Sequence, residues 1–244
     1  MSAIQPQDTV GEIVARRPEL SRVFEKIGID YCCGGKRPLA EVCRKKGWQV
    51  EVLIAQLEAT AEAQQGTPVV DAASMSLTEL AEHIEVAHHG YLRREFPRLD
   101  ALTEKVARVH GDEDPRLHEL RKTYVAFADD LLAHMAKEEK VLFPLIRQIE
   151  TDPASLECLC GTINPPIQQM EKEHHDAGDA LTAFRELTDD FTPPEWACNT
   201  YRAMLDAFAP LERDMHQHIH KEDTVLFPAA MKRHNAQLGK RMAS

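Results

Sequence analysis

Apolar side chains recur every three or four residues along most of the chain, which is the spacing of one face of an α-helix. Alternating runs of β-branched residues, the pattern typical of strands, are almost absent from the sequence. The pattern therefore predicts an all-α protein. Four long helical stretches, separated by segments that contain Gly or Pro, are typical of an antiparallel four-helix bundle; they cover residues 76–109, 115–150, 165–189 and 193–235.

The N-terminal part of the chain has shorter helical stretches, which Gly and Pro interrupt. We expect a small helical module over residues 1–63 and, because the periodic pattern fades there, a linker over residues 64–76. Ser76 and Glu79 have the spacing of a capping box, which predicts that a helix begins at this point. The bundle is then expected over residues 77–244.

The composition narrows the class of protein. The chain has 29 Lys and Arg against 40 Asp and Glu, a net charge of −11, which disfavours a nucleic-acid-binding surface. No stretch approaches the roughly 20 apolar residues of a membrane span, and the N-terminus lacks the order of a signal peptide. We therefore expect a cytoplasmic protein that binds no membrane, and most of its six cysteines as free thiols.

A duplicated motif carries the candidate chemistry. Residues 134–144 align with residues 218–228, and seven of the eleven positions are identical. Each copy has a His and, four residues later, a Glu, so the two side chains share one helix face. Buried imidazoles and carboxylates need compensation, which a metal such as iron, zinc or manganese supplies. The alternative, two solvated or salt-bridged faces, is disfavoured because the motif occurs twice.

Periodicity selects one histidine on each of the other two long helices. His88 shares its face with apolar residues, whereas His89 shares its face with charged ones, and His174 is preferred to His175 for the same reason. On the fourth helix the same argument makes His216 and His220 surface residues. The predicted metal ligands are therefore His88, His134, Glu138, His174, His218 and Glu222.

Four imidazole nitrogens and two carboxylates suit two metal ions better than one, and they leave coordination positions open for a small molecule. Asp130 and Asp214 stand one turn before His134 and His218, where they are candidates to orient these imidazoles. Solvated positions are an equally good interpretation of both aspartates.

A ferritin-like carboxylate site is the structural competitor. Glu85 and Glu171 each stand three residues before a histidine, as the Glu-x-x-His element of such sites requires. This arrangement would leave the duplicated His134 and His218 unused. We therefore prefer the histidine-rich site and expect both glutamates as surface charges.

Together the segment from Asp30 to Gly35 (Asp-Tyr-Cys-Cys-Gly-Gly) and the two helices with His-x-x-x-Glu resemble the repair-of-iron-centres family, of the ScdA/YtfE type, with its hemerythrin-like domain. The resemblance implies the same six ligands, holding two iron ions with an oxo or hydroxo bridge. It also implies binding of nitric oxide or dioxygen, with nitric oxide reductase activity as a candidate, in the response to nitrosative and oxidative stress and in the repair of iron–sulfur clusters. Iron–sulfur proteins and an electron donor are the implied partners, with a homodimer as a candidate assembly; the alternative function is a non-enzymatic sensor or scavenger of either gas.

The vicinal thiols of Cys32 and Cys33 are candidate redox or nitrosyl-transfer groups, because a Gly-Gly turn at a helix end can lower thiol pKa values. Cys158 and Cys160 form a weaker thiol signal, since no second pair at zinc spacing accompanies them. The two remaining cysteines are expected on helix faces; they are Cys43 and Cys198.

Overall fold

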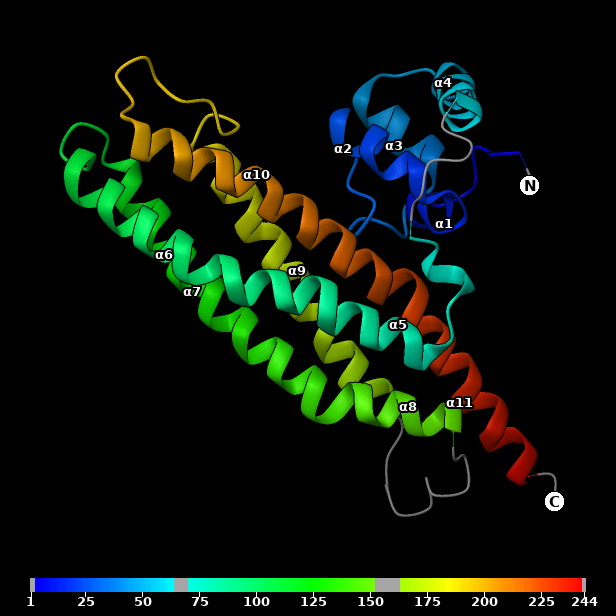
Figure 1. Cartoon of the computed structure of the whole chain (residues 1–244). Helices are drawn as coiled ribbons and strands as arrows, with labels where there is room; N and C mark the ends of the chain where they lie inside the picture. The colour runs from blue at the N-terminus through cyan, green and yellow to red at the C-terminus, as the bar shows by residue number, and fades with distance from the viewer. Residues whose placement is uncertain (1–2, 64–69, 152–162, 243–244) are drawn as a thin grey trace. The chain divides into compact units, whose positions relative to one another are not determined.

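A computed structural model describes residues 3–63, 70–151 and 163–242 (Figure 1). Within these ranges the chain is helical, with no strand beyond the bridge pair of Thr9 and Pro38, so the prediction of an all-α protein is confirmed. The helices of this described part are all too short or too polar to cross a membrane. Cys158 and Cys160 and part of the predicted linker, residues 64–69, lie outside the described residues.

The chain divides into two compact units. One comprises residues 1–80 together with residues 216–244, and the other comprises residues 81–215. The boundary at residue 216 falls inside a continuous helix. Near the other boundary, the backbone N–H of Ser76 donates to the Glu79 carboxylate over 2.8 Å, and that of Glu79 donates to Ser76 Oγ over 3.2 Å. The predicted capping box is therefore present.

The N-terminal module lies in the first unit. Its helices close around an apolar core in which Phe24, Leu39 and Leu57 are fully buried. A capping box also starts the first helix, because the backbone N–H of Glu12 donates to Thr9 Oγ1 and the Glu12 carboxylate accepts from the Thr9 N–H. The module consists of α1 (Val10–Arg16), α2 (Ser21–Lys26), α3 (Leu39–Lys46) and α4 (Val50–Ala63).

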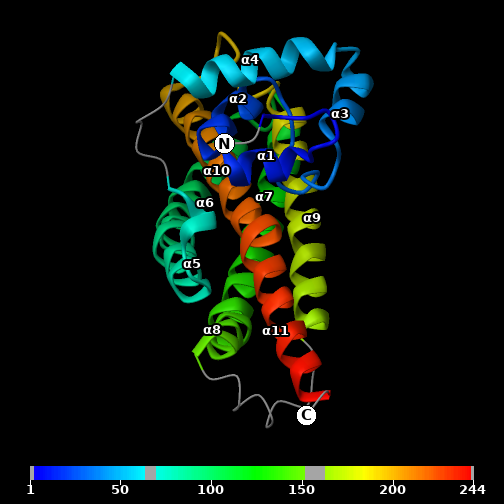
Figure 2. The ribbon, with the colours of Figure 1, turned by 90° about the vertical axis from the view of Figure 1, so that its right-hand side faces the viewer.

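The second unit is built from the long helices. In Figures 1 and 2 helix α7 runs alongside α6 and α9. Aromatic side chains of the long helices pack together in a core. Phe184 is central to this core, with ring centroids 5.3 Å from Phe127 and 4.9 Å from Phe208. The long helices are α6 (Gly90–His110), α7 (Arg116–Lys137), which α8 (Phe143–Thr151) continues, α9 (Asn164–Leu187) and α10 (Asn199–His220). Helix α10 crosses a boundary between the units, as does α5 (Leu77–His83), which precedes α6; α11 (Phe227–Met242), which continues α10, belongs to the first unit.

The predicted helix bounds agree closely with these elements, with one exception. Pro165 and Pro166 open α9, as expected of prolines at a helix start. Pro193 and Pro194 instead lie in an irregular segment, and α10 begins only at Asn199.

Within the described residues, three π-helical turns interrupt the long helices. They cover Ile84–His89, Glu138–Leu142 and Lys221–Leu226. A π-helical turn contains one more residue than the α-helical turn it replaces, so side chains on either side of it change register, and such turns are frequent at functional sites. All three turns contain or adjoin the histidines and glutamates that the sequence singled out.

Candidate metal centre

His134 and Glu138 stand where α7 passes into its π-helical turn. Both side chains are buried, with 2% and 0% of their surface exposed. The four-residue spacing places His134 Nε2 3.3 Å from Glu138 Oε2. The first copy of the duplicated motif is therefore a buried imidazole–carboxylate pair, and the alternative of a solvated face does not describe it.

Helix α9 contributes a second imidazole to this pair. His174 is buried, and its Nε2 lies 3.2 Å from Nε2 of His134. The ligand atoms of His134, Glu138 and His174 all lie within 4.8 Å of one another, close enough for one metal ion to bind all three. His175, which periodicity placed outside, is exposed.

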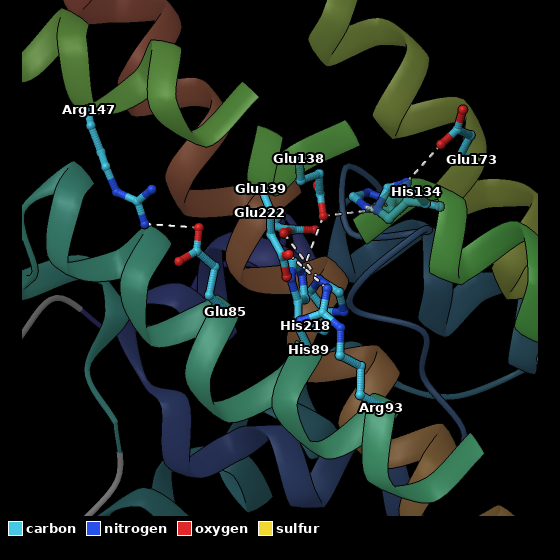
Figure 3. A network of polar contacts seen from close by, with 11 residues as sticks. Glu85, His89, Arg93, His134, Glu138, Glu139, Arg147, Glu173, His218 and Glu222 are labelled. Atoms are coloured by element: carbon cyan, nitrogen blue, oxygen red, sulfur yellow. Dashed lines mark hydrogen bonds and ion pairs between the residues drawn. The ribbon is translucent and has the colours of Figure 1, made fainter. Parts of the chain in front are cut away.

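His89 lies on the other side of the Glu138 carboxylate (Figure 3). It is fully buried, its ring stacks on Phe143 with centroids 5.8 Å apart, and its Nε2 is 3.4 Å from Glu138 Oε2. The sequence placed His89 among charged residues, and that prediction is wrong. The cause is the π-helical turn Ile84–His89, which changes the register that a regular helical period assumes.

His88 is also buried, but it lies in different surroundings. Its Nδ1 is 2.9 Å from Asp214 Oδ1, and its ring meets His83 edge to face. Among the described residues, the groups of donors close enough to share a metal include His89 and do not include His88. On this helix the geometry therefore favours His89 over His88 as a metal ligand. Asp214, a candidate to orient His218, contacts His88.

The second copy of the motif belongs to the first compact unit. His218 Nε2 lies 3.1 Å from Glu222 Oε1, and both side chains are fully buried. The π-helical turn Lys221–Leu226 follows His218, as the turn Glu138–Leu142 follows His134. The two copies thus share local geometry as well as sequence.

Two of these histidines contact a carboxylate through Nδ1, the ring nitrogen that faces away from Glu138. These carboxylates were not predicted from the sequence. His134 Nδ1 is 2.8 Å from Glu173, and His89 Nδ1 is 2.7 Å from Glu139. Burial alone would raise the pKa of Glu173, but hydrogen bonds from Lys137, Gln169 and His134 outweigh burial and lower this pKa to about 2.

The pKa of Glu139 is likewise lowered, because hydrogen bonds from Arg93 and His89 outweigh its burial. One signal in the sequence could have identified Glu139: the matching position in the second copy of the motif, Asp223, is acidic too. Asp130, the residue expected to orient His134, is exposed.

The carboxylates of the ferritin-like alternative lie elsewhere. Glu85 forms an ion pair with Arg147 over 3.0 Å, as Figure 3 shows, and its side chain is 26% exposed. Glu171 is half-buried. Neither belongs to the donor groups found in the described residues.

The prediction that His220 lies at the surface is wrong. Within the first unit, the Tyr31 ring packs edge to face on His220 with centroids 5.3 Å apart, and the imidazole is buried. Burial lowers the pKa of His220 to about 4, because it disfavours the charged ring. His216, the other residue expected outside, is half-buried beside the same tyrosine.

Cys32 and Cys33 lie in a tight loop of the N-terminal module. A Cβ at Gly35 would come within 2.5 Å of the Tyr31 carbonyl oxygen, so the loop requires Gly at this position. The two sulfur atoms are 3.7 Å apart, and Cys32 Sγ is 3.2 Å from Asp30 Oδ1, which places three donors within reach of one metal ion. The pKa of Cys32 is raised, because its thiol hydrogen-bonds to Cys33, is buried and lies beside the charge of Asp30. This direction is opposite to the lowered thiol pKa expected from the sequence.

The donor set of the bundle helices fits a transition metal. A fully buried carboxylate is costly unless a positive charge compensates it, and Glu138 has imidazoles of His89 and His134 beside the same oxygen. Imidazole and carboxylate together suit iron, zinc or manganese better than calcium or magnesium. The imidazole nitrogens and carboxylate oxygens present here are therefore suitable ligands for a transition-metal cation.

Comparison with known proteins identifies the family. The family model described as the hemerythrin HHE cation binding domain matches residues 80–230, and a domain of unknown function (ScdA_N, DUF542) matches residues 6–61. Curated proteins named iron–sulfur cluster repair protein YtfE, from Enterobacter sp. (strain 638), Shigella boydii serotype 4 (strain Sb227) and Escherichia coli (strain K12 / DH10B), are each 37% identical over 223 residues. The alignments cover 91% of this chain and 96% of each relative. The chain therefore belongs to the ScdA/YtfE-type family, in which an ScdA_N domain precedes a hemerythrin-like cation-binding domain that binds non-haem iron.

Proposed function

We propose that the buried histidines and glutamates of the hemerythrin-like domain form one centre for two iron ions. The observation that carries this proposal is the buried cluster of His134, Glu138 and His174, together with the same imidazole–carboxylate pair in the second copy of the motif. The residues that would hold the ions are His89, His134, Glu138, His174, His218 and Glu222, and the two glutamates would be shared between the ions.

One observation supports assigning both copies of the motif to one centre. The cation-binding family match is continuous over residues 80–230 and so includes both copies.

We further propose that the protein binds nitric oxide at this centre and supports the repair of damaged iron–sulfur clusters. The repair function is supported by the relatives, which are named iron–sulfur cluster repair proteins. The binding of nitric oxide is supported by the donor count: four imidazoles, two shared carboxylates and one shared oxygen would supply about ten of the roughly twelve bonds that two octahedral ions take. Two iron ions held in this way would offer open positions for a diatomic ligand.

Apolar side chains accompany the proposed ligands. Met135, Leu142 and Phe143 are buried close to Glu138 along the chain, and the Phe143 ring stacks on His89. Buried charge next to apolar side chains needs compensation, which the proposed cations would supply.

A titration of the reduced protein with nitric oxide tests this function. Wild type should bind nitric oxide in proportion to its iron and show a nitrosyl signal by EPR spectroscopy. The double variant Glu138→Gln/Glu222→Gln should lose the iron and the signal, because amides replace both bridging carboxylates. Glu85→Gln, which changes a carboxylate outside the donor groups, is the matched control and should behave as wild type.

The outcomes of this titration separate the candidate functions. Release of nitrous oxide over many turnovers, with an added reductant, would indicate a reductase, whereas uptake in proportion to iron without product would indicate a binding protein. A wild-type protein that contains iron but takes up no nitric oxide would contradict the proposal.

A further inference from the structure

Two buried histidines of the proposed centre are held in the same way. His89 Nδ1 is 2.7 Å from Glu139 Oε1, and His134 Nδ1 is 2.8 Å from Glu173 Oε2. The other ring nitrogen of each histidine points toward the carboxylate of Glu138 (Figure 3). His89 Nε2 is 3.4 Å from Glu138 Oε2, and His134 Nε2 is 3.3 Å from the same atom.

This arrangement selects one tautomer of each ring. A neutral imidazole carries one N–H group, and an ionised carboxylate can only accept a hydrogen bond. Glu139 and Glu173 therefore hold the proton on Nδ1, which leaves the lone pair of Nε2 facing the cluster. A metal ion binds a ring nitrogen through that lone pair.

Each carboxylate is itself anchored near the surface. Glu139 accepts from Arg93 Nη2 over 2.7 Å, and Glu173 accepts from Gln169 Nε2 over 2.7 Å and forms an ion pair with Lys137. The side chains of Glu139 and Glu173 are 25% and 21% exposed, so each contact chain runs from a buried imidazole to solvent.

We propose that Glu139 and Glu173 are positioning residues of the metal centre, which fix the Nδ1–H tautomer and the ring orientation of His89 and His134 before metal binds. The inference rests on the proposed function, because it assigns His89 and His134 to the centre. It goes beyond that function in assigning a role to two acidic residues that contact no metal ion.

The two pairs also join helices, so a merely structural role must be distinguished. Glu139 follows α7 and contacts His89 at the end of the π-helical turn before α6, while Glu173 lies on α9 and contacts His134 on α7. Thermal stability alone would therefore not test the inference. The ring tautomers and the affinity for metal are the properties that a structural contact would leave unchanged.

The test uses Glu139→Ala and Glu173→Ala, with Glu85→Ala as the matched control. Glu85 belongs to the same π-helical turn as His89 and also forms an ion pair, with Arg147, outside the donor groups. Two-dimensional ¹⁵N NMR of the metal-free full chain reports the tautomer of each ring. We expect the Nδ1–H form of His89 to be lost in Glu139→Ala and that of His134 in Glu173→Ala, with neither changed in Glu85→Ala.

Titration of the same proteins with Co²⁺, followed by its visible absorption bands, measures the affinity. Each Ala variant should bind Co²⁺ roughly 10–100-fold more weakly than wild type. Glu139→Gln and Glu173→Gln keep an acceptor oxygen and should recover most of the affinity. Unchanged tautomers and an unchanged Co²⁺ affinity in the Ala variants would overturn the inference.

The two readouts separate this inference from the proposed function. A wild-type protein that binds no Co²⁺ and no iron would refute the metal centre, while the tautomers of the metal-free protein would still decide the role of the two glutamates. A wild-type protein that binds metal and Ala variants that equal it would refute only the positioning role.

Discussion

At the scale of single residues, the exposed Cys198 has surroundings unlike those of the other described cysteines. It stands immediately before α10, and its sulfur is 3.2 Å from His110 Nε2. Hydrogen bonds from the backbone of Tyr201 and from His110 lower the pKa of this thiol to about 7, against a small opposing effect of burial. Burial instead raises the pKa of Cys43.

This difference predicts the pH dependence of alkylation. The thiolate is the reactive form, so the alkylation rate at Cys198 should follow the fraction of thiolate. The rate should increase as the pH is raised, with a midpoint near pH 7, and should be low at more acidic pH, where the thiol is protonated. Rates at each cysteine can be measured by mass spectrometry after timed exposure to iodoacetamide. His110→Phe should move the midpoint upward; a midpoint at the ordinary value of about 8.5 in wild type would contradict the assignment.

Two signals in the sequence identified buried polar residues at the candidate site. The duplicated motif indicated His134, Glu138, His218 and Glu222, and apolar neighbours on the same helix face indicated His174; all five are buried. The burial of His89 could not be found in this way, since the argument assumed a regular helical period. The contact of Glu173 with His134 joins two helices, so no spacing within one helix reveals it.

At the scale of elements, the long helices were predictable and their π-helical turns were not. Their bounds follow from apolar periodicity and from the prolines between helices, both of which are local signals. A π-helical turn differs from an α-helical turn in its hydrogen-bonding pattern. Its residues have no distinctive composition, so the sequence does not reveal where such a turn occurs. The exception among the bounds is α10, where Pro193 and Pro194 lie in an irregular segment rather than at the helix start.

An ion pair joins α9 to α10 within the second unit. Arg185 donates from Nε and Nη2 to the two carboxylate oxygens of Glu212, over 2.6 and 2.5 Å. The Glu212 side chain is only 8% exposed, whereas that of Arg185 is 41% exposed. The pair is therefore intermediate between surface ion pairs, which contribute little, and buried pairs, which are costly to break.

We expect Arg185→Ala to lower the free energy of unfolding by about 1–3 kcal/mol, because it leaves the buried Glu212 carboxylate without its partner. Urea denaturation of the metal-free protein, followed by circular dichroism, measures this change. Lys122→Ala, which removes an exposed partner of Glu119, is the control and should have little effect. Equal unfolding midpoints for Arg185→Ala and Lys122→Ala would show that the Arg185 pair contributes nothing.

At the scale of the whole molecule, the chain combines a small helical module with a cation-binding domain. The sequence placed residues 216–244 with the bundle, while spatial contacts group them with the first 80 residues. The contacts responsible join distant parts of the chain within that unit: a Cβ at Gly11 would lie 3.0 Å from Thr224 Oγ1, and Tyr31 packs on His220. Such contacts leave no periodic signal in the sequence.

Counting the iron tests the central claim most directly. Protein purified without oxygen should contain close to two iron ions per chain, and Mössbauer spectroscopy of the oxidised form should show a coupled pair. His89→Ala should reduce the iron content, while His88→Ala should retain most of it, because only His89 lies beside Glu138. One iron ion or none in wild type, or a full complement in His89→Ala, would contradict the account.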